Sequence, residues 1–282
     1  MASSLEPQVV GVIGSPITHS LSPLLHNTAF EEMGMPWTSV AFEVGVGGGA
    51  GAVESMRLLG IRGLSVTMPL KAEVALAADL LEQSAKMLNS VNCLSLEGGT
   101  IVGLSTDGDG LLAAIAAHNG LSVADRSVMV VGSGGAARSV AAALGLAGAS
   151  EVIVVARNRS NASLVAALSG TVGRVGDSGE ASGVDLIIET TPVGMEGTAE
   201  RDSTPLVPGH LLHAGQVAVD LVYRPRETDW ILDARRSGAD AIGGLGMLVH
   251  QAALQIERWT GADAPVNKMR DAVSGELGGS SW

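Results

Sequence analysis

Cysteine is almost absent from this 282-residue chain, which contains only Cys93. A single cysteine excludes an internal disulfide and a cysteine-rich metal site, and we predict no metal. Proteins without disulfides are typical of the reducing cytoplasm, where we expect this one to be located. Aromatic residues make up 2% of the chain, so the core must be built from alanine, valine, leucine and isoleucine.

Long apolar runs are also missing, because none approaches the ~20 residues that cross a bilayer. Residues 1–6 contain no basic residue and no long apolar region, so we expect no signal peptide. Positive charge is scarce, with three lysines and a net charge of −12. This charge argues against binding to nucleic acids or anionic membranes. An anionic ligand must therefore be held by locally placed basic side chains or helix N-termini.

Hydrophobic residues are plentiful, at 46% of the chain against 16% charged residues. This balance predicts a packed globular core rather than a disordered chain. The length suits one large domain or two of ordinary size. The local composition changes at about Asp107, where we place a domain boundary.

A glycine turn near the middle of the chain predicts a nucleotide site. The apolar residues 128–131 lead directly into Gly132-Ser133-Gly134-Gly135-Ala136, and a helix-favouring segment follows. Strand, tight loop and helix in this order can cradle a pyrophosphate, because glycines allow close approach of backbone N–H groups at a helix N-terminus. The spacing is incomplete, and a plain strand-to-helix turn would have the same composition.

The second half of the chain alternates between strand and helix patterns. We expect strands at 128–131, 151–156, 185–189 and 216–222, and helices at 136–146 and from about 161. This alternation predicts a parallel sheet covered on both faces, with ligands beyond the carboxyl ends of its strands. The second strand is followed by Arg157-Asn158-Arg159-Ser160 and no acid, which favours the 2′-phosphate of NADP over NAD. Two exposed arginines with no role in phosphate binding would give the same sequence pattern.

The first half predicts a second α/β unit. We expect strands at 8–13, 37–44 and 61–66 and a hairpin of 90–96 with 100–104, with helices at 24–33, 52–59 and 111–118. Two further helices should close the chain, one ending near 259 and one at 267–277. Ser22 before Pro23 is expected to cap its helix, while Ser20 and Ser22 together could hold a carboxylate.

Four polar residues of these elements have both a structural and a functional interpretation. Lys71 would begin a helix, where a cation is unfavourable, so it is a surface lysine or an acid/base group. Asn92 lies in a predicted strand and needs partners if it is buried. Asp107 is a helix cap or a functional carboxylate, and Gln251 lies on a hydrated helix face or in a site.

A set of motifs, in this order along the chain, resembles the shikimate dehydrogenase family over about residues 9–275. They are Gly14-Ser15-Pro16-Ile17 and Ser20-Leu21-Ser22-Pro23, then Val66-Thr67-Met68-Pro69-Leu70-Lys71, Val91-Asn92 and Thr106-Asp107-Gly108, and later the turn at Gly132, Asn158-Arg159-Ser160, Thr191-Pro192-Val193-Gly194-Met195, Tyr223 and Met247 through Gln251. The resemblance implies an N-terminal α/β substrate domain (1–106), a Rossmann-type NADP-binding domain with a parallel sheet (107–239), and C-terminal helices (240–282) that return to the first domain.

The resemblance also implies a reaction, the NADP-dependent interconversion of 3-dehydroshikimate and shikimate in the chorismate pathway to aromatic amino acids. Lys71 and Asp107, 36 positions apart, would form the catalytic pair. The substrate would be bound by Ser20, Ser22, Ser65, Thr67, Asn92, Tyr223 and Gln251. NADP would be bound by Gly132, Ser133, Gly134, Gly135, Ala136, Asn158, Arg159, Ser160, Thr191, Pro192, Val193, Gly194, Met195, Leu221, Gly244 and Met247. A monomer and a homodimer are both compatible with these motifs.

Four positions depart from the family pattern. The family commonly has Asn at Ser65, Ser105 and Glu189, and Thr at Cys93. Ser65 leaves a quinate/shikimate dehydrogenase using NAD as an alternative. A non-catalytic nucleotide sensor is a second, although it would have no need of a proton donor at Lys71. A methylenetetrahydrofolate dehydrogenase is a third, which the paired serines fit less well because they suit a small carboxylate.

Overall fold

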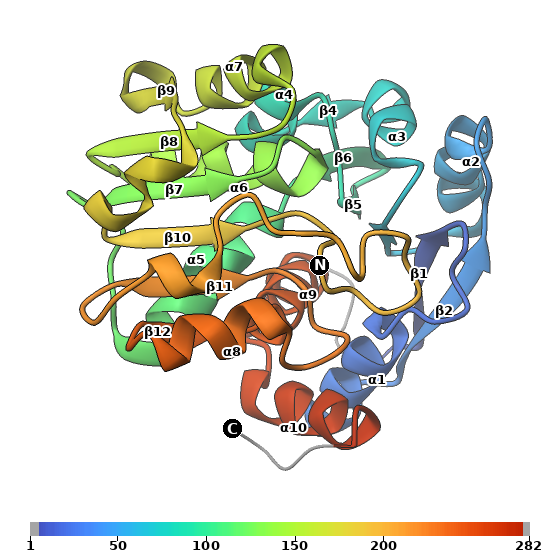
Figure 1. The fold of residues 1–282 in the computed structure, drawn as a ribbon. Coiled ribbons are helices and arrows are strands. Elements are labelled where there is room, and N and C mark those ends of the chain that lie inside the picture. Colours follow the sequence, from blue (N-terminus) through green and yellow to red (C-terminus); the bar gives the residue numbers. More distant parts are fainter. Residues whose placement is uncertain (1–5, 279–282) are drawn as a thin grey trace. The chain divides into compact units, whose positions relative to one another are not determined.

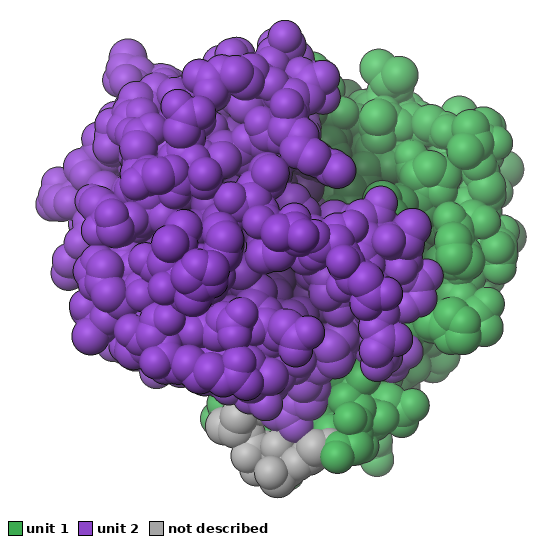
Figure 2. All heavy atoms as spheres, in the orientation of Figure 1, with its two compact units in different colours: residues 1–106, 249–282 green, residues 107–248 purple. Residues whose placement is uncertain are grey.

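The computed structural model describes residues 6–278. Residues 1–5, most of the segment in which we expect no signal peptide, and residues 279–282 lie outside the described part. The chain forms two compact units (Figure 2), which we call unit 1 (residues 1–106 and 249–282) and unit 2 (residues 107–248). Among the helices of residues 6–278, none combines the length and the hydropathy that crossing a bilayer requires.

Unit 1 contains a mixed sheet with the strand order β2-β1-β3-β5-β6-β4. The strands are β1 (Gln8–Gly14), β2 (Trp37–Glu43), β3 (Gly63–Val66), β4 (Leu80–Leu81), β5 (Cys93–Glu97) and β6 (Thr100–Leu104). Strand β1 runs parallel to β2 and β3, and β5 and β6 form the predicted antiparallel hairpin with Glu97 opposite Thr100. The carboxyl ends of β1 and β3 therefore lie next to each other.

Six helices accompany this sheet (Figure 1): α1 (Ser22–Glu32), α2 (Gly49–Leu59), α3 (Lys71–Ala77), α4 (Gln83–Leu88), α10 (Val266–Glu276) and α9 (Leu245–Thr260), which enters unit 1 at residue 249. Aliphatic side chains of β1, β3, α2 and α3, such as Ile13, Leu64, Met56 and Val74, form one core. Helix α10 packs against α1, so the end of the chain is part of the unit formed by its beginning.

Unit 2 contains a wholly parallel sheet with the strand order β12-β11-β10-β7-β8-β9. The strands are β7 (Ser127–Val131), β8 (Glu151–Val155), β9 (Gly173–Val175), β10 (Leu186–Glu189), β11 (Val217–Asp220) and β12 (Asp240–Ile242). Counted from β7, this is the order 3-2-1-4-5-6 of the dinucleotide-binding fold. The predicted parallel sheet is confirmed.

Helices cover both faces of this sheet, as Figure 1 shows. They are α5 (Asp107–Asn119), α6 (Gly135–Leu146), α7 (Arg159–Ala167) and α8 (Asp229–Arg236), with 3-10 turns η1 (Gly170–Val172), η2 (Ser178–Gly183) and η3 (Gly209–Leu211). In β7, Val128 and Val130 pack against α5, α6 and α7, whereas Met129 and Val131 pack against Trp230 of α8 and its neighbours. A strand buried on both faces reads as a continuous apolar run.

Candidate active site

The glycine turn lies at the point where the strand order of unit 2 reverses. Strand β7 pairs with β8 on one side and with β10 on the other, and connections leave in opposite directions from this point. Gly132 follows β7 with a φ of 123°, and a Cβ there would stand 2.3 Å from Oγ1 of Thr190. The Thr190 hydroxyl in turn donates to the carbonyl of Val131 at 2.7 Å. The turn and the loop after β10 are therefore packed together, and only glycine fits between them.

The next two glycines face open space. A Cβ at Gly134 or Gly135 would meet no atom within 4 Å. Helix α6 begins at Gly135, and no side chain caps it. Its first N–H groups therefore lack the partners that a capping side chain would supply, and they lie at the positive end of the helix dipole. Such an open glycine turn at a helix N-terminus is the kind of arrangement that accepts a pyrophosphate.

Residues 157–160, which follow β8 and the partly buried Ala156, are all exposed. The Asn158 side chain caps α7 by accepting from the N–H of Asn161 at 3.0 Å. Nη1 of Arg159 lies 2.9 Å from Oδ1 of Asp177, with the two side chains 64% and 77% exposed. A surface pair of this kind contributes little stability, so Arg159 can exchange Asp177 for a phosphate. Arg157 and Ser160 lie beside it in the sequence.

Glycine also allows close packing at two of the remaining predicted cofactor residues. Gly194 has a φ of 82° and lies next to Thr228, while a Cβ at Gly244 would stand 2.1 Å from the carbonyl oxygen of Leu221. Met247 packs on the core shared by α5, α6 and α7. Tyr223 is partly buried, and desolvation raises the pKa of its phenol.

Two carboxyl side chains lie at the carboxyl ends of the strands of unit 2, and the sequence drew attention to only one of them. Glu189 ends β10 and Asp220 ends β11, and both are buried. Burial raises the pKa of Glu189 to about 7 and that of Asp220 to about 6. Sequence reasoning noted Glu189 as a departure from the family and missed Asp220, whose position beside it follows only from the strand register.

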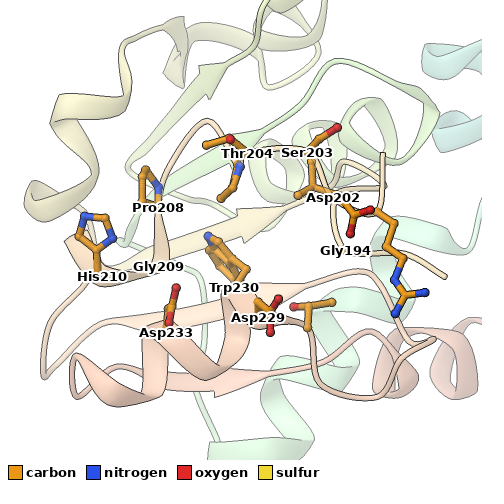
Figure 3. Close-up of a pocket in the computed structure, with 14 residues that line it drawn as sticks. Gly194, Asp202, Ser203, Thr204, Pro208, Gly209, His210, Asp229, Trp230 and Asp233 are labelled. Atoms are coloured by element: carbon orange, nitrogen blue, oxygen red, sulfur yellow. The ribbon is translucent and has the colours of Figure 1, made fainter. Parts of the chain in front are cut away.

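A pocket of about 500 Å³ lies beside this edge of unit 2 (Figure 3). Gly194 lines it, together with Asp202, Asp229, Asp233 and Arg201. Three carboxylates against one guanidinium repel a phosphate group. The dinucleotide phosphates are therefore better placed at the glycine turn than in this pocket.

In unit 1 backbone hydrogen bonds connect the carboxyl ends of β1 and β3. The N–H of Thr67 donates to the carbonyl of Ile13 at 2.9 Å, and the N–H of Ser15 donates to that of Met68 at 3.0 Å. A Cβ at Gly14 would stand 2.3 Å from Cγ2 of Thr67. Ser65 lies buried in β3, two residues before Thr67.

The expectation that Ser22 caps helix α1 is wrong. The helix begins at Ser22 itself, the cap position is Leu21, and no side chain caps it. The N–H of Leu25 donates to the carbonyl of Leu21 at 3.1 Å, so the first helical turn already includes Ser22, one residue earlier than the Ser-Pro pattern indicated. The N–H of Ser22 donates to Oγ of Ser20 at 3.3 Å, so the two predicted serines do lie together.

Lys71 begins α3, as expected, and its carbonyl accepts from the N–H of Val91 at 2.9 Å. The expectation that Asn92 lies within a strand is wrong, because β5 begins at Cys93. The buried Asn92 side chain is instead fixed by Thr106, whose N–H donates to Oδ1 at 2.8 Å and whose hydroxyl accepts from Nδ2 at 3.0 Å. Asp107 follows Thr106 in the chain and opens α5.

Helix α9 adds two buried amides to this cluster, so the hydrated-face interpretation of Gln251 is wrong. Gln251 is 8% exposed and Gln255 0%. Nε2 of Gln255 donates to Oε1 of Gln251 at 3.0 Å and to the carbonyl of Asn92 at 3.1 Å. The Thr106 hydroxyl donates to the carbonyl of Gln251 at 3.1 Å. Sequence reasoning missed Gln255, although its spacing of four residues from Gln251 places it on the same helix face.

Comparison with known proteins decides the family. The model of the shikimate dehydrogenase substrate binding domain matches residues 12–94, and that of the shikimate 5′-dehydrogenase C-terminal domain matches residues 244–273. The NADP(+)-dependent shikimate dehydrogenase of Methanopyrus kandleri is 38% identical over 278 residues, which cover 95% of each chain. This chain belongs to the shikimate dehydrogenase family.

The similarity extends over both units. The shikimate dehydrogenase of Methanothermobacter thermautotrophicus is 37% identical over 94% of this chain and 95% of its own. The crystal structure of the Thermus thermophilus enzyme, in complex with NADP(H) and shikimate, superposes with a TM-score of 0.87 at 32% identity, covering 95% of this chain and 99% of that one. The family resemblance inferred from the motifs is thus confirmed, and the matched substrate binding domain contains Ser20, Lys71 and Asn92.

Proposed function

We propose that this chain is an NADP-dependent oxidoreductase that interconverts 3-dehydroshikimate and shikimate. Its relatives over about 95% of the chain are named for this activity, and the Thermus thermophilus structure is a complex with NADP(H) and shikimate. One observation carries the proposal: the same chain combines a phosphate cradle at the strand-order reversal of unit 2 with a buried hydroxyl and amide cluster in unit 1.

In this proposal unit 2 binds NADP, and unit 1 supplies the substrate-binding residues other than Tyr223, which belongs to unit 2. The residues that would bind the pyrophosphate are Gly132–Ala136, with the N-terminus of α6 behind them. Arg159 would bind the 2′-phosphate, with Asn158 and Ser160 beside it. The loop 191–195 and residues Leu221, Gly244 and Met247 would border the nicotinamide half. When bound, NADP(H) supplies or accepts the hydride.

The substrate would be recognised by groups of several elements. Ser20 and Ser22 at the start of α1, with Ser65 and Tyr223, would receive its carboxylate. Thr67, Asn92 and Gln251 would bind its ring oxygens. The amide of Asn92 supports this role, because Thr106 fixes it in one orientation before any ligand binds.

Proton transfer is the chemistry that the protein itself must supply. A ketone that accepts a hydride becomes an alkoxide and needs a proton. The Lys71 ammonium would donate this proton from Nζ and take it back during oxidation. Asp107 would stabilise the charged lysine and fix its direction. The carbonyl of Lys71 accepts from the N–H of Val91, which fixes the backbone at Lys71. Thr106, which directly precedes Asp107, is hydrogen-bonded to the side chain of Asn92.

An absorbance assay at the nicotinamide band tests the proposal and separates it from its alternatives. Purified protein should reduce NADP in the presence of shikimate, and much more slowly with NAD or with quinate. Preference for quinate and NAD would favour the alternative that Ser65 leaves open. Tight NADPH binding with no turnover of either acid would favour the nucleotide sensor and overturn the proposal.

We also propose that the protein is cytoplasmic and acts as a monomer or homodimer. The buried Cys93, which has no disulfide partner, suits a reducing compartment. Light scattering coupled to size-exclusion chromatography gives the oligomeric state, and fractionation of the source cells gives the location. A larger assembly or an exported protein would contradict this part of the proposal.

A further inference from the structure

Two carboxyl groups end neighbouring strands at the ligand edge of unit 2. Glu189 is the last residue of β10 and Asp220 the last of β11, and they stand opposite each other in the register. The side chains are 1% and 0% exposed. On the other side of β10 the register partner of Glu189 is Val131 of β7, which is apolar. The charged group that flanks Glu189 in the sheet is therefore Asp220.

The two carboxyls differ in their hydrogen bonds. Both oxygens of Asp220 accept, one from the N–H of Val222 at 2.9 Å and the other from the Thr228 hydroxyl at 2.6 Å. Oε1 of Glu189 accepts from the N–H of Thr191 at 2.8 Å, but its Oε2 is buried without a partner. A buried anionic oxygen without a donor is unfavourable, and more so beside a second carboxylate. A protonated Glu189 carboxyl relieves both costs.

The position of Glu189 connects its charge to the phosphate cradle. Its carboxyl holds the N–H of Thr191, in the loop that follows β10. The preceding residue, Thr190, is bonded to Val131 and packs against Gly132. A negative charge on Glu189 would therefore lie on the strand next to the turn that receives an anionic ligand. A neutral carboxyl keeps the same hydrogen bond to Thr191 without the repulsion.

We propose that Glu189 is a positioning residue of the cofactor site, and that the dinucleotide binds to the form of this chain in which the Glu189 carboxyl is protonated. Binding to the ionised form is then coupled to uptake of one proton. The inference rests on the proposed function only in placing NADP(H) at the glycine turn. The pKa of Glu189 agrees with it: burial raises this pKa to about 7 against the opposing hydrogen bonds from Thr191, and Asp220 adds a smaller increase.

The first test is the pH dependence of NADPH affinity, measured by fluorescence titration between pH 7 and 8.5. The 2′-phosphate is largely ionised in this range, because its second pKa lies near 6. The dissociation constant of the wild type should rise by up to about tenfold per pH unit. Glu189→Gln keeps the size and an acceptor for Thr191, and its affinity should not change with pH. Equal slopes for the wild type and Glu189→Gln would overturn the proposal.

A matched control removes a carboxylate at the start of a strand, whereas Glu189 lies at the end of one. Glu151 begins β8 and pairs with Arg174, so Glu151→Gln makes the same chemical change away from the cradle. Its pH dependence should equal that of the wild type. If Glu151→Gln abolished the pH dependence, the effect would be one of overall charge, and the proposal would fail.

The second test uses the wild type alone and does not depend on a variant folding. Calorimetric titration of NADPH at pH 8 in two buffers with different ionisation enthalpies counts the protons taken up. We expect close to one proton, and zero uptake or net release would overturn the proposal. Proton uptake without shikimate turnover would leave this inference standing and remove the proposed function. Shikimate turnover with pH-independent NADPH binding would overturn this inference and leave the proposed function standing. The absence of any NADPH binding would overturn both the inference and the proposed function.

Discussion

Lys71 is one of three lysines, and it begins a helix at the end where a cation is unfavourable. We expect Lys71→Ala to lower kcat for shikimate oxidation by roughly 10²- to 10⁴-fold, because proton transfer by a positioned group contributes about that much. KM should change far less, since the lost interaction belongs to the transition state. Steady-state kinetics measures both constants. Lys86→Ala, which removes an exposed lysine of α4, should leave them unchanged. A raised KM with intact kcat would take Lys71 out of the chemistry.

Arg159 is expected to discriminate between the two nicotinamide cofactors. Its exposed pairing with Asp177 can be exchanged for the 2′-phosphate of NADPH. Loss of one exposed charge-assisted contact should weaken NADPH binding by about tenfold in Arg159→Ala and leave NADH binding nearly unchanged. Fluorescence titration with each cofactor measures the two constants. Arg236→Ala, at the exposed end of α8, is the control. Equal losses for both cofactors would place 2′-phosphate recognition elsewhere.

Single residues also show what the sequence could not reveal. The motifs marked Asn92, but its partner Thr106 lies 14 residues away and meets it only through the β5–β6 hairpin. Asp220 lies beside Glu189 because of the order in which the strands pair, and no local pattern encodes that order. Helix α1 begins one residue earlier than the Ser-Pro pattern predicts, because its first turn closes on the carbonyl of Leu21 and not on a capping side chain. Residue types were thus predictable, whereas their partners depended on tertiary structure.

At the scale of elements, helix α9 fixes the polar cluster of unit 1 through one face. Gln251, Gln255 and Trp259 follow at intervals of four, and the indole N–H of Trp259 donates to the carbonyl of Leu94 at 3.0 Å. Gln255→Leu would leave the carbonyl of Asn92 and Oε1 of Gln251 without this donor. We expect a loss of about 1–3 kcal/mol in the free energy of unfolding, and a raised KM for shikimate because Gln251 is no longer held.

Denaturant unfolding and steady-state kinetics check this prediction. Gln83→Leu makes the same change at an exposed position of α4 and should alter neither quantity. A Gln255→Leu variant with reduced stability and an unchanged KM would limit Gln255 to a structural role.

Long or strongly patterned elements were predictable, and short ones were not. The four apolar strands β7, β8, β10 and β11 and helices α6 and α9 were expected at nearly their observed positions. Strands β4 and β12 have two and three residues, too few to show a period. Helix α8 was missed despite its signals, since Thr228 caps it, Asp229 begins it and arginines end it. This miss was avoidable, whereas the short strands depend on pairing.

At the scale of the whole molecule, the two units should respond to pH in opposite directions. In unit 1, complete burial lowers the pKa of His26 to about 3, from 6.5 in an exposed histidine. The folded state therefore keeps His26 neutral, and its contribution to stability is lost as the pH falls from about 6.5 towards 3. In unit 2, Glu189 has its pKa raised from about 4.5 to about 7. Its contribution is lost as the pH rises through that window, because the folded state must ionise a buried group.

Each group changes the free energy of unfolding by about 1.4 kcal/mol per pH unit within its window. Relative to the wild type, Glu189→Gln should therefore gain up to about 3 kcal/mol between pH 4.5 and 7 and keep that difference at higher pH. His26→Asn, which can still bond Ser39, should lose stability at pH 7 and recover relative to the wild type below pH 6. Differential scanning calorimetry of both variants from pH 4.5 to 8 measures these differences. Parallel pH profiles for the two variants would show that these buried groups do not set the pH response of their units.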